Sequence, residues 1–233
     1  MLRFLFGESP HTPQGELADA VKSMTAAAAY FRREAERGRD MNHKQRTYEI
    51  WTLGLISSLD ELEQSHYAAQ RFGSRIRSDT YAGLTDEERL DYRRYVYFDK
   101  NMFIRLFALL DKLGTLLNDR LALETERVKP YFSYFTVLRR MRERRLHGQL
   151  AAALNEVNDK YEDSMTRLRK RRNVEVHNMN SELQDDLAQS RLHYGTEMKL
   201  ENLQQQIDDS AAGLAMAAET LRIAFDYLNS ARR

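Results

Sequence analysis

The side chains best suited to chemistry in this sequence are Arg172, Asn173 and His177, which stand at an Arg-x4-His spacing. Histidine is the side chain whose ordinary pKa suits proton transfer near neutral pH. Arginine can stabilise negative charge that builds on phosphoryl oxygens, and asparagine can hold a histidine tautomer or bind phosphate. A spacing this short also arises by chance in many proteins. Its meaning therefore depends on the elements that position it.

A regular helix does not aim Arg172 and His177 at one point. At 100° per residue, Asn173 and His177 lie about 40° apart on one flank of a helix. Arg172 and His177 lie about 140° apart, and Arg172 continues the apolar stripe from Leu168. Three arrangements would bring the groups together: the helix loosens near 173–177, the long arginine side chain closes the gap, or the site is composite across two chains.

Two further interpretations of these residues remain open. Arg171-x5-His177 is an alternative register of the same pattern. In addition, Arg172 could be a structural arginine that pairs with a core acid such as Asp111 or Glu61. In that interpretation His177 is an exposed residue near a helix C-terminus, where the helix dipole favours a histidine.

A balanced net charge conceals a local asymmetry. The chain has 36 basic and 35 acidic residues, a formal net charge of +1, which excludes a general basic field for nucleic acid. Residues 138–172 nevertheless hold eleven basic and five acidic side chains, a net +6, and residues 181–209 hold two basic and seven acidic ones, a net −5. The basic segment predicts a rim that binds a polyanion, since arginine offers paired donors to phosphate. The candidate contacts are Arg139, Arg140, Arg167, Arg169, Lys170 and Arg171. The alternative is a solvated helix face whose charges pair with the acidic segment.

The composition favours an all-helical chain. Three prolines and ten glycines interrupt 233 residues, and 42% of the residues are apolar, enough for a core. Thr85 and Glu88 form a capping-box pattern, and Gly114 could bend the helix that follows. In the second helix the apolar positions step by three, at Ile50, Leu53, Ile56, Leu59 and Leu62. Helices are expected at about 14–37, 41–72, 85–123, 131–145, 150–177 and 200–228, with a loop at 73–83.

The residue types also limit the cellular setting and the chemistry. The absence of cysteine removes disulfides, thiolate nucleophiles and sulfur-ligated zinc, and indicates a reducing compartment. No segment approaches the ~18 apolar residues of a membrane span. The histidines lack a recognised metal-ligand arrangement. We therefore expect a cytoplasmic protein with no membrane partner, no metal and no cofactor.

These features together resemble the HEPN superfamily (higher eukaryotes and prokaryotes nucleotide-binding). Its members carry an Arg-x4–6-His motif near the end of a helix, often with a polar residue directly after the arginine, as Asn173 follows Arg172 here. The resemblance covers roughly residues 41–230, a HEPN-like helical domain, and leaves residues 1–40 as an N-terminal helical extension. It implies an all-α, up-down bundle of four main helices, with extra N-terminal and connecting helices, that forms a homodimer.

The resemblance also implies an activity. In catalytic members the motifs of two chains meet across the dimer axis and cleave RNA without metal, leaving a 2′,3′-cyclic phosphate. Carried over to this sequence, His177 would be the acid and base, Arg172 the electrostatic stabiliser and Asn173 the positioning residue. The basic rim would then bind RNA. A toxin or defence role, with an antitoxin as partner, is the matching biological expectation.

Two other classes of function are compatible with the same sequence. One is a non-catalytic helical dimer that binds a nucleotide or a protein. The other is a structural, coiled-coil-like partner that uses the apolar stripe of residues 200–228, which holds over four heptads.

Overall fold

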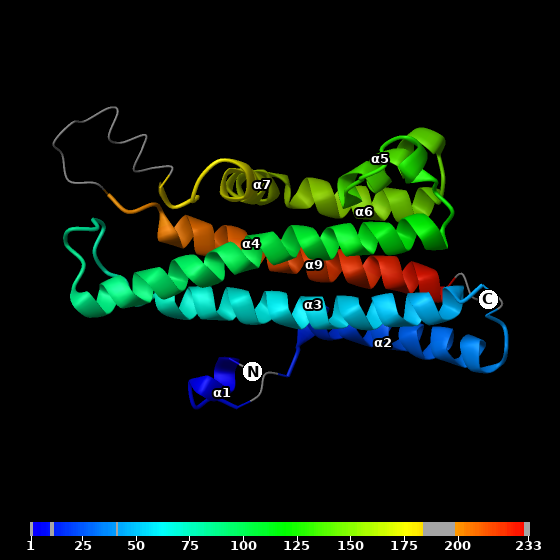
Figure 1. The fold of residues 1–233 in the computed structure, drawn as a ribbon, viewed down its shortest axis with the longest axis horizontal. Helices are drawn as coiled ribbons and strands as arrows, with labels where there is room; N and C mark the ends of the chain where they lie inside the picture. The colour runs from blue at the N-terminus through cyan, green and yellow to red at the C-terminus, as the bar shows by residue number, and fades with distance from the viewer. Residues whose placement is uncertain (1, 10–11, 41, 184–198, 231–233) are drawn as a thin grey trace. The chain divides into compact units, whose positions relative to one another are not determined.

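The computed structural model describes residues 2–9, 12–40, 42–183 and 199–230, and its regular elements are all helical (Figure 1). The expected all-α fold is therefore confirmed for this part of the chain. In chain order the helices are α1 (Leu2–Leu5), α2 (Gly15–Glu36), α3 (Lys44–Gly73), α4 (Asp86–Arg120), η1 (Thr125–Arg127), α5 (Tyr134–Arg144), α6 (Gly148–Lys160), α7 (Glu162–His177) and α9 (Leu203–Ser230). None of them is long and apolar enough to cross a membrane. Four charged residues of the acidic segment, Asp185, Asp186, Arg191 and Glu197, lie outside the described residues.

The described helices gather into two compact units. Unit 1 comprises Met1–Ser9, Leu62–Arg105 and Glu162–Leu214, and unit 2 comprises Pro10–Glu61, Leu106–Tyr161 and Ala215–Arg233. Helices α1 and α7 therefore belong to unit 1, and α2, α5 and α6 belong to unit 2. The long helices α3, α4 and α9 each contribute one segment to each unit.

Unit 1 has a core of aromatic and small residues. Its buried members are Ala68, Ala69, Phe72, Leu84, Tyr92, Tyr95 and Ile207, from α3, α4, α9 and the 73–84 loop. Helix α1 joins this core through Phe6, whose ring meets Phe72 edge-on with 5.6 Å between centroids. Burying such rings removes a large apolar area from water and supplies most of the stability of a small unit.

Unit 2 has an aliphatic core built on α4. The α4 residues Leu106, Leu109, Leu110, Leu113, Leu116 and Leu117 are all buried. Helix α2 contributes the buried residues Met24 and Phe31 to the same unit. Helix α9 contributes the buried residues Leu221, Phe225 and Leu228. The apolar stripe of the last helix is thus used within the chain, so it is not free for the coiled-coil role considered above.

The strongest start signal in the sequence is confirmed. Glu88 N–H donates to Thr85 Oγ1 (3.2 Å) and Thr85 N–H donates to Glu88 Oε2 (3.0 Å), the reciprocal bonds of a capping box. The backbone hydrogen bond from Thr85, the largest cause, and that from Arg77 lower the pKa of Glu88 to about 2. Helix α2 begins at Gly15, one residue after the expected start, and its N-cap Gln14 is extended and makes no side-chain capping hydrogen bond.

Two patterns gave wrong expectations. Ile50 and Leu53 are 56% and 42% exposed, whereas Leu55 and Leu59 are buried. A step of three residues turns back by 60°, so three such steps carry a stripe halfway around a helix. The expected single helix at 150–177 is divided at Tyr161, which ends α6 before α7 begins. There, Tyr161 and Lys160 both contact the Glu219 carboxylate of α9 (3.3 and 2.8 Å), a contact that helical periodicity does not encode.

Gly114 serves a close approach between helices. A Cβ at this position would lie 2.9 Å from the Cα of Tyr134 in α5. That Tyr134 backbone is held in place, because its N–H donates to Asp111 of α4 (2.9 Å). The glycine therefore allows α5 to pack directly against the α4 backbone.

We expect Gly114→Ala to lower the free energy of unfolding by about 1–3 kcal/mol, because a backbone clash outweighs the higher helix propensity of alanine. The matched control is Gly54→Ala in α3, where a Cβ meets nothing within 4 Å. That control should gain about 0.5–1 kcal/mol. Urea unfolding of both variants checks this, and a change of the same sign in both would contradict the packing argument.

Candidate active site

Helix α7 has two chemically different faces. Met165 and Leu168 are buried, and Arg171 and Glu175 continue this inward stripe at helical spacing. Lys170, Asn173 and His177 are exposed, and they share the other face at i, i+3 and i+7. The α-helix continues through His177, its last residue. The loosening of the helix near 173–177, considered from sequence, is therefore not present.

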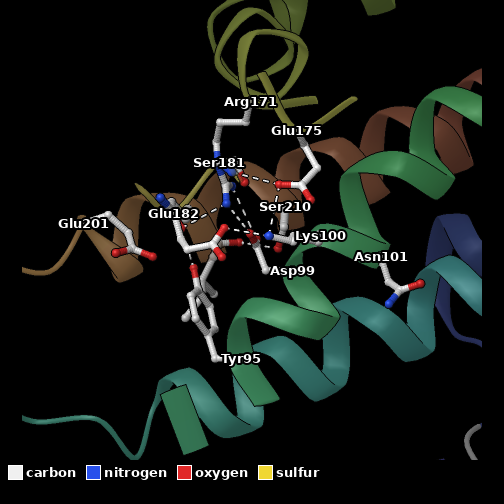
Figure 2. Close-up of polar contacts among 12 residues, drawn as sticks. Tyr95, Asp99, Lys100, Asn101, Arg171, Glu175, Ser181, Glu182, Glu201 and Ser210 are labelled. Atoms are coloured by element: carbon white, nitrogen blue, oxygen red, sulfur yellow. Dashed lines mark hydrogen bonds and ion pairs between the residues drawn. The ribbon is translucent and has the colours of Figure 1, made fainter. Parts of the chain in front are cut away.

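Arg171 is anchored in the interior of unit 1. Its guanidinium forms a two-pronged ion pair with Asp99 of α4, in which Nη1 donates to Oδ1 at 3.3 Å and Nη2 donates to Oδ2 (Figure 2). Nη2 also donates to Gln206 Oε1 of α9 (3.1 Å), which accepts a further bond from Tyr95 (2.8 Å). The guanidinium carbon lies 5.0 Å from the centroid of the Phe103 ring.

The electrostatics of this pair reflect its burial. Asp99 has a 3% exposed side chain and Arg171 a 16% exposed one. Burial raises the pKa of Asp99 above its ordinary value, although Arg171 acts to lower it. For Arg171 burial acts to lower the pKa, but the Asp99 charge outweighs it, so the pKa is raised and the guanidinium stays charged. Such a pair fixes the position of α7 against α4, because separating the two residues would leave a buried charge without compensation.

A second ionic cluster fastens the chain on both sides of His177. Lys100 of α4 contacts Glu175 (3.1 Å) and Glu182 (2.6 Å), and the Ser181 N–H donates to Glu175 (2.8 Å). Burial acts to raise the pKa of Glu175, but the Ser181 N–H and the Lys100 ammonium outweigh it and lower the pKa. Figure 2 shows these residues converging beside Arg171. The turn that contains His177 is therefore tied to α4 before and after the histidine.

The predicted catalytic residues lie at different depths on this anchored helix. Arg172 is half-buried, whereas Asn173 and His177 are exposed. Because α7 stays regular, the 140° between Arg172 and His177 persists. The structural pairing considered from sequence concerned Arg172 with Asp111 or Glu61, whereas the buried pair described above is Arg171 with Asp99. Asp111, one of the acids considered for that role, accepts the backbone N–H of Tyr134.

The predicted basic rim is distributed over both units. In unit 1, Arg167 donates to Asp209 of α9 through two bonds (2.8 and 2.6 Å), and Arg171 is paired as described. Arg169 is half-buried and Lys170 is exposed. In unit 2, Arg140 Nε donates to the Leu123 carbonyl (3.2 Å), and Arg139 is exposed. Arg167 thus pairs with a residue of the acidic segment 181–209, as the alternative interpretation of the sequence expected.

Sequence reasoning missed Asp99, Lys100 and Gln206. Asp99 and Lys100 are adjacent charged residues at the start of an otherwise apolar helix interior, and this is the signal that could have marked them. Gln206 carries no comparable signal. Among the residues that the structure describes, no three His, Asp or Glu side chains are grouped in a way that could hold a metal ion.

Glu201 is a half-buried carboxylate near the same cluster. Burial raises its pKa to about 7, although a hydrogen bond from Tyr92 and the charge of Arg171 act to lower it. Asp99 also raises this pKa. The folded protein therefore binds a proton on Glu201 between about pH 7 and pH 4.5, where the unfolded chain binds less.

We expect this carboxyl to make the protein more stable as the pH falls from 8 to 5. With a pKa of about 7 in the folded protein and 4.5 in the unfolded chain, the free energy of unfolding gains about 2–3 kcal/mol between pH 8 and pH 5, and this gain is lost as the pH rises through 7. Glu201→Gln should remove this part of the pH dependence, and the exposed control Glu156→Gln should retain it. Urea unfolding at each pH measures both, and identical pH profiles for wild type and Glu201→Gln would refute the expectation.

Comparison with known proteins gives one match. No curated protein and no solved structure matches the chain. A family model described as Cthe2314-like HEPN matches residues 51–229, most of the chain, including all of α7. The resemblance inferred from the Arg-x4-His spacing is thereby confirmed, and the chain belongs to the Cthe2314-like HEPN family.

Proposed function

We propose that this protein is a metal-independent RNA endonuclease of the toxin or defence type, with Arg172, Asn173 and His177 as its catalytic group. The observation that carries the proposal is the presentation of Asn173 and His177 on the exposed face of α7. The buried Arg171–Asp99 pair and the Lys100 cluster hold that helix and the turn after it. An enzyme site needs such support, because small displacements of a catalytic group cost large factors in rate.

In this mechanism the RNA 2′-hydroxyl attacks the adjacent phosphorus and the 5′-oxygen of the next nucleotide leaves. His177 takes the proton of the hydroxyl or gives one to the leaving oxygen. Arg172 stabilises the negative charge on the phosphoryl oxygens. Asn173, one turn before His177 on the same flank, orients the imidazole or binds the phosphate. The product carries a 2′,3′-cyclic phosphate.

The site is composite in this proposal. A regular α7 separates Arg172 from His177 by about 140°, so one chain does not direct both groups to one phosphate through helix geometry. A homodimer whose α7 helices meet at a two-fold axis would place Arg172 of one copy beside His177 of the other. Exposed Val176, 52% accessible on α7, is an apolar residue such a contact would cover. An antitoxin that occupied this face would block the site.

Two cations on α7 suit the RNA backbone. Lys170 is exposed on the face of Asn173 and His177, and Arg169 is one turn before Asn173. Arg167 and Arg171 have their guanidinium groups engaged by Asp209 and Asp99. Arg167 and Arg171 therefore have a structural role. We assign the RNA contact near the motif to the exposed Lys170, with Arg169 beside it on the helix.

We expect the purified protein to cleave single-stranded RNA in EDTA, and His177→Asn to lower the cleavage rate at least about 100-fold, since asparagine transfers no proton at neutral pH. The matched control is His43→Asn. His43 is exposed and has φ +55°, a conformation that asparagine tolerates. Gel analysis of labelled RNA measures the rates. Equal cleavage by wild type and His177→Asn would refute the assignment, and absence of cleavage in both would favour the non-catalytic binding protein.

A further inference from the structure

An open groove lies between α5 and α6 in unit 2. Its volume is about 410 Å3, and its lining includes Arg142 and Arg145 at one end and Met141, Ala151 and Ala152 along its floor. Gly148, the first residue of α6, also lines it, and a Cβ there would meet nothing within 4 Å. The groove is therefore open at the end where the two arginines stand.

Four arginines on α5 and the turn after it remain unneutralised. They are exposed, and none of their side chains makes a hydrogen bond or ion pair with another residue in the described part of the chain. The four are Arg139, Arg142, Arg144 and Arg145. This contrasts with Arg167 and Arg171 on α7, which buried carboxylates engage. Within segment 138–172, α5 and the turn after it thus hold four exposed arginines with no partner among the described residues.

Two of these arginines stand at the groove. Arg142, in the last turn of α5, and Arg145, its C-cap, both line it. Two cations at one groove can contact neighbouring phosphates of a single strand. The α6 first turn carries no acidic side chain that would compete with an anion.

The rest of the groove suits a nucleobase. Met141, Ala151 and Ala152 give it an apolar lining, and Asn155 and Asp159 line it farther along α6. Their oxygens can accept hydrogen bonds from the amino groups of a base. The groove is thus basic where a phosphate would lie, apolar in the middle and acceptor-rich beyond.

We propose that the α5–α6 groove binds a strand of single-stranded RNA, with phosphates on Arg142 and Arg145 and a base over Ala151 and Ala152. The choice of RNA as ligand rests on the proposed function, but this site lies in unit 2 and takes no part in the cleavage step. Its role is to hold the strand.

The test measures RNA binding in a His177→Asn background, so that the strand stays intact. Fluorescence anisotropy with an unstructured 12-nucleotide RNA compares Arg142→Gln/Arg145→Gln with the matched control Arg33→Gln/Arg93→Gln, two exposed arginines outside the groove. The groove variant should bind at least about tenfold more weakly, and its salt dependence should fall by roughly 1.4 in log–log slope, two phosphate contacts at ~0.7 each. The control should change less than about twofold.

A second variant keeps the arginines. Gly148→Glu places a carboxylate in the open groove at the first residue of α6, where an acid favours the helix. It should leave the urea midpoint unchanged or higher and weaken RNA binding several-fold. Equal RNA affinity in the groove and control variants, or displacement of the RNA by adenosine monophosphate at the affinity of the RNA itself, would overturn the proposal. If the groove variant loses RNA binding but the wild-type protein does not cleave RNA, the groove proposal stands and only the proposed function fails.

Discussion

The buried ion pair between Arg171 and Asp99 determines how α7 is rotated. Removing one member of a buried pair typically costs about 3–5 kcal/mol, because the other charge is left without compensation. Any rotation of α7 that exposed Arg171 would meet that cost. With Arg171 directed inward, helical geometry places Arg172 on the flank and Asn173 and His177 on the exposed face. One contact therefore determines which of the two adjacent arginines, ambiguous in the sequence, is directed inward: Arg171 pairs with Asp99. The catalytic role of Arg172 belongs to the proposed function.

Much of the fold was predictable because helical periodicity and capping are local signals. The low content of proline and glycine predicted an all-helical chain, and the Thr85–Glu88 capping box indicated the start of α4. The sequence-based predictions failed where a residue far away in the chain determines the local structure. The break at Tyr161 coincides with contacts to Glu219, 58 positions away. The close approach of the α5 backbone to Gly114 likewise depends on a distant segment. Ile50 was expected on a buried stripe but is exposed, because residues spaced by three do not stay on one face of a helix.

The same distinction explains the candidate site. The residues Arg172, Asn173 and His177 were identified from their spacing, whereas the groups that hold them came from α4 and α9. Neither a spacing nor a local charge sum indicates which cations are paired across the fold. Segment 138–172 has a net charge of +6, yet Arg167 is neutralised by Asp209 and Arg171 by Asp99. Arg142 and Arg145, by contrast, have no carboxylate partner among the described residues and line a groove that no motif indicated.

In the proposed composite site, Arg172 of one copy acts with His177 of the other, and complementation between two inactive variants tests this arrangement. Arg172→Gln and His177→Asn chains are each expected to be inactive alone. When the two are co-expressed in equal amounts, half of the dimers are mixed and each mixed dimer contains one intact composite site. RNA cleavage in EDTA should then recover to about a quarter of the wild-type rate. No recovery, in a preparation where mixed dimers are demonstrated by mass, would contradict the composite site and place both groups within one chain.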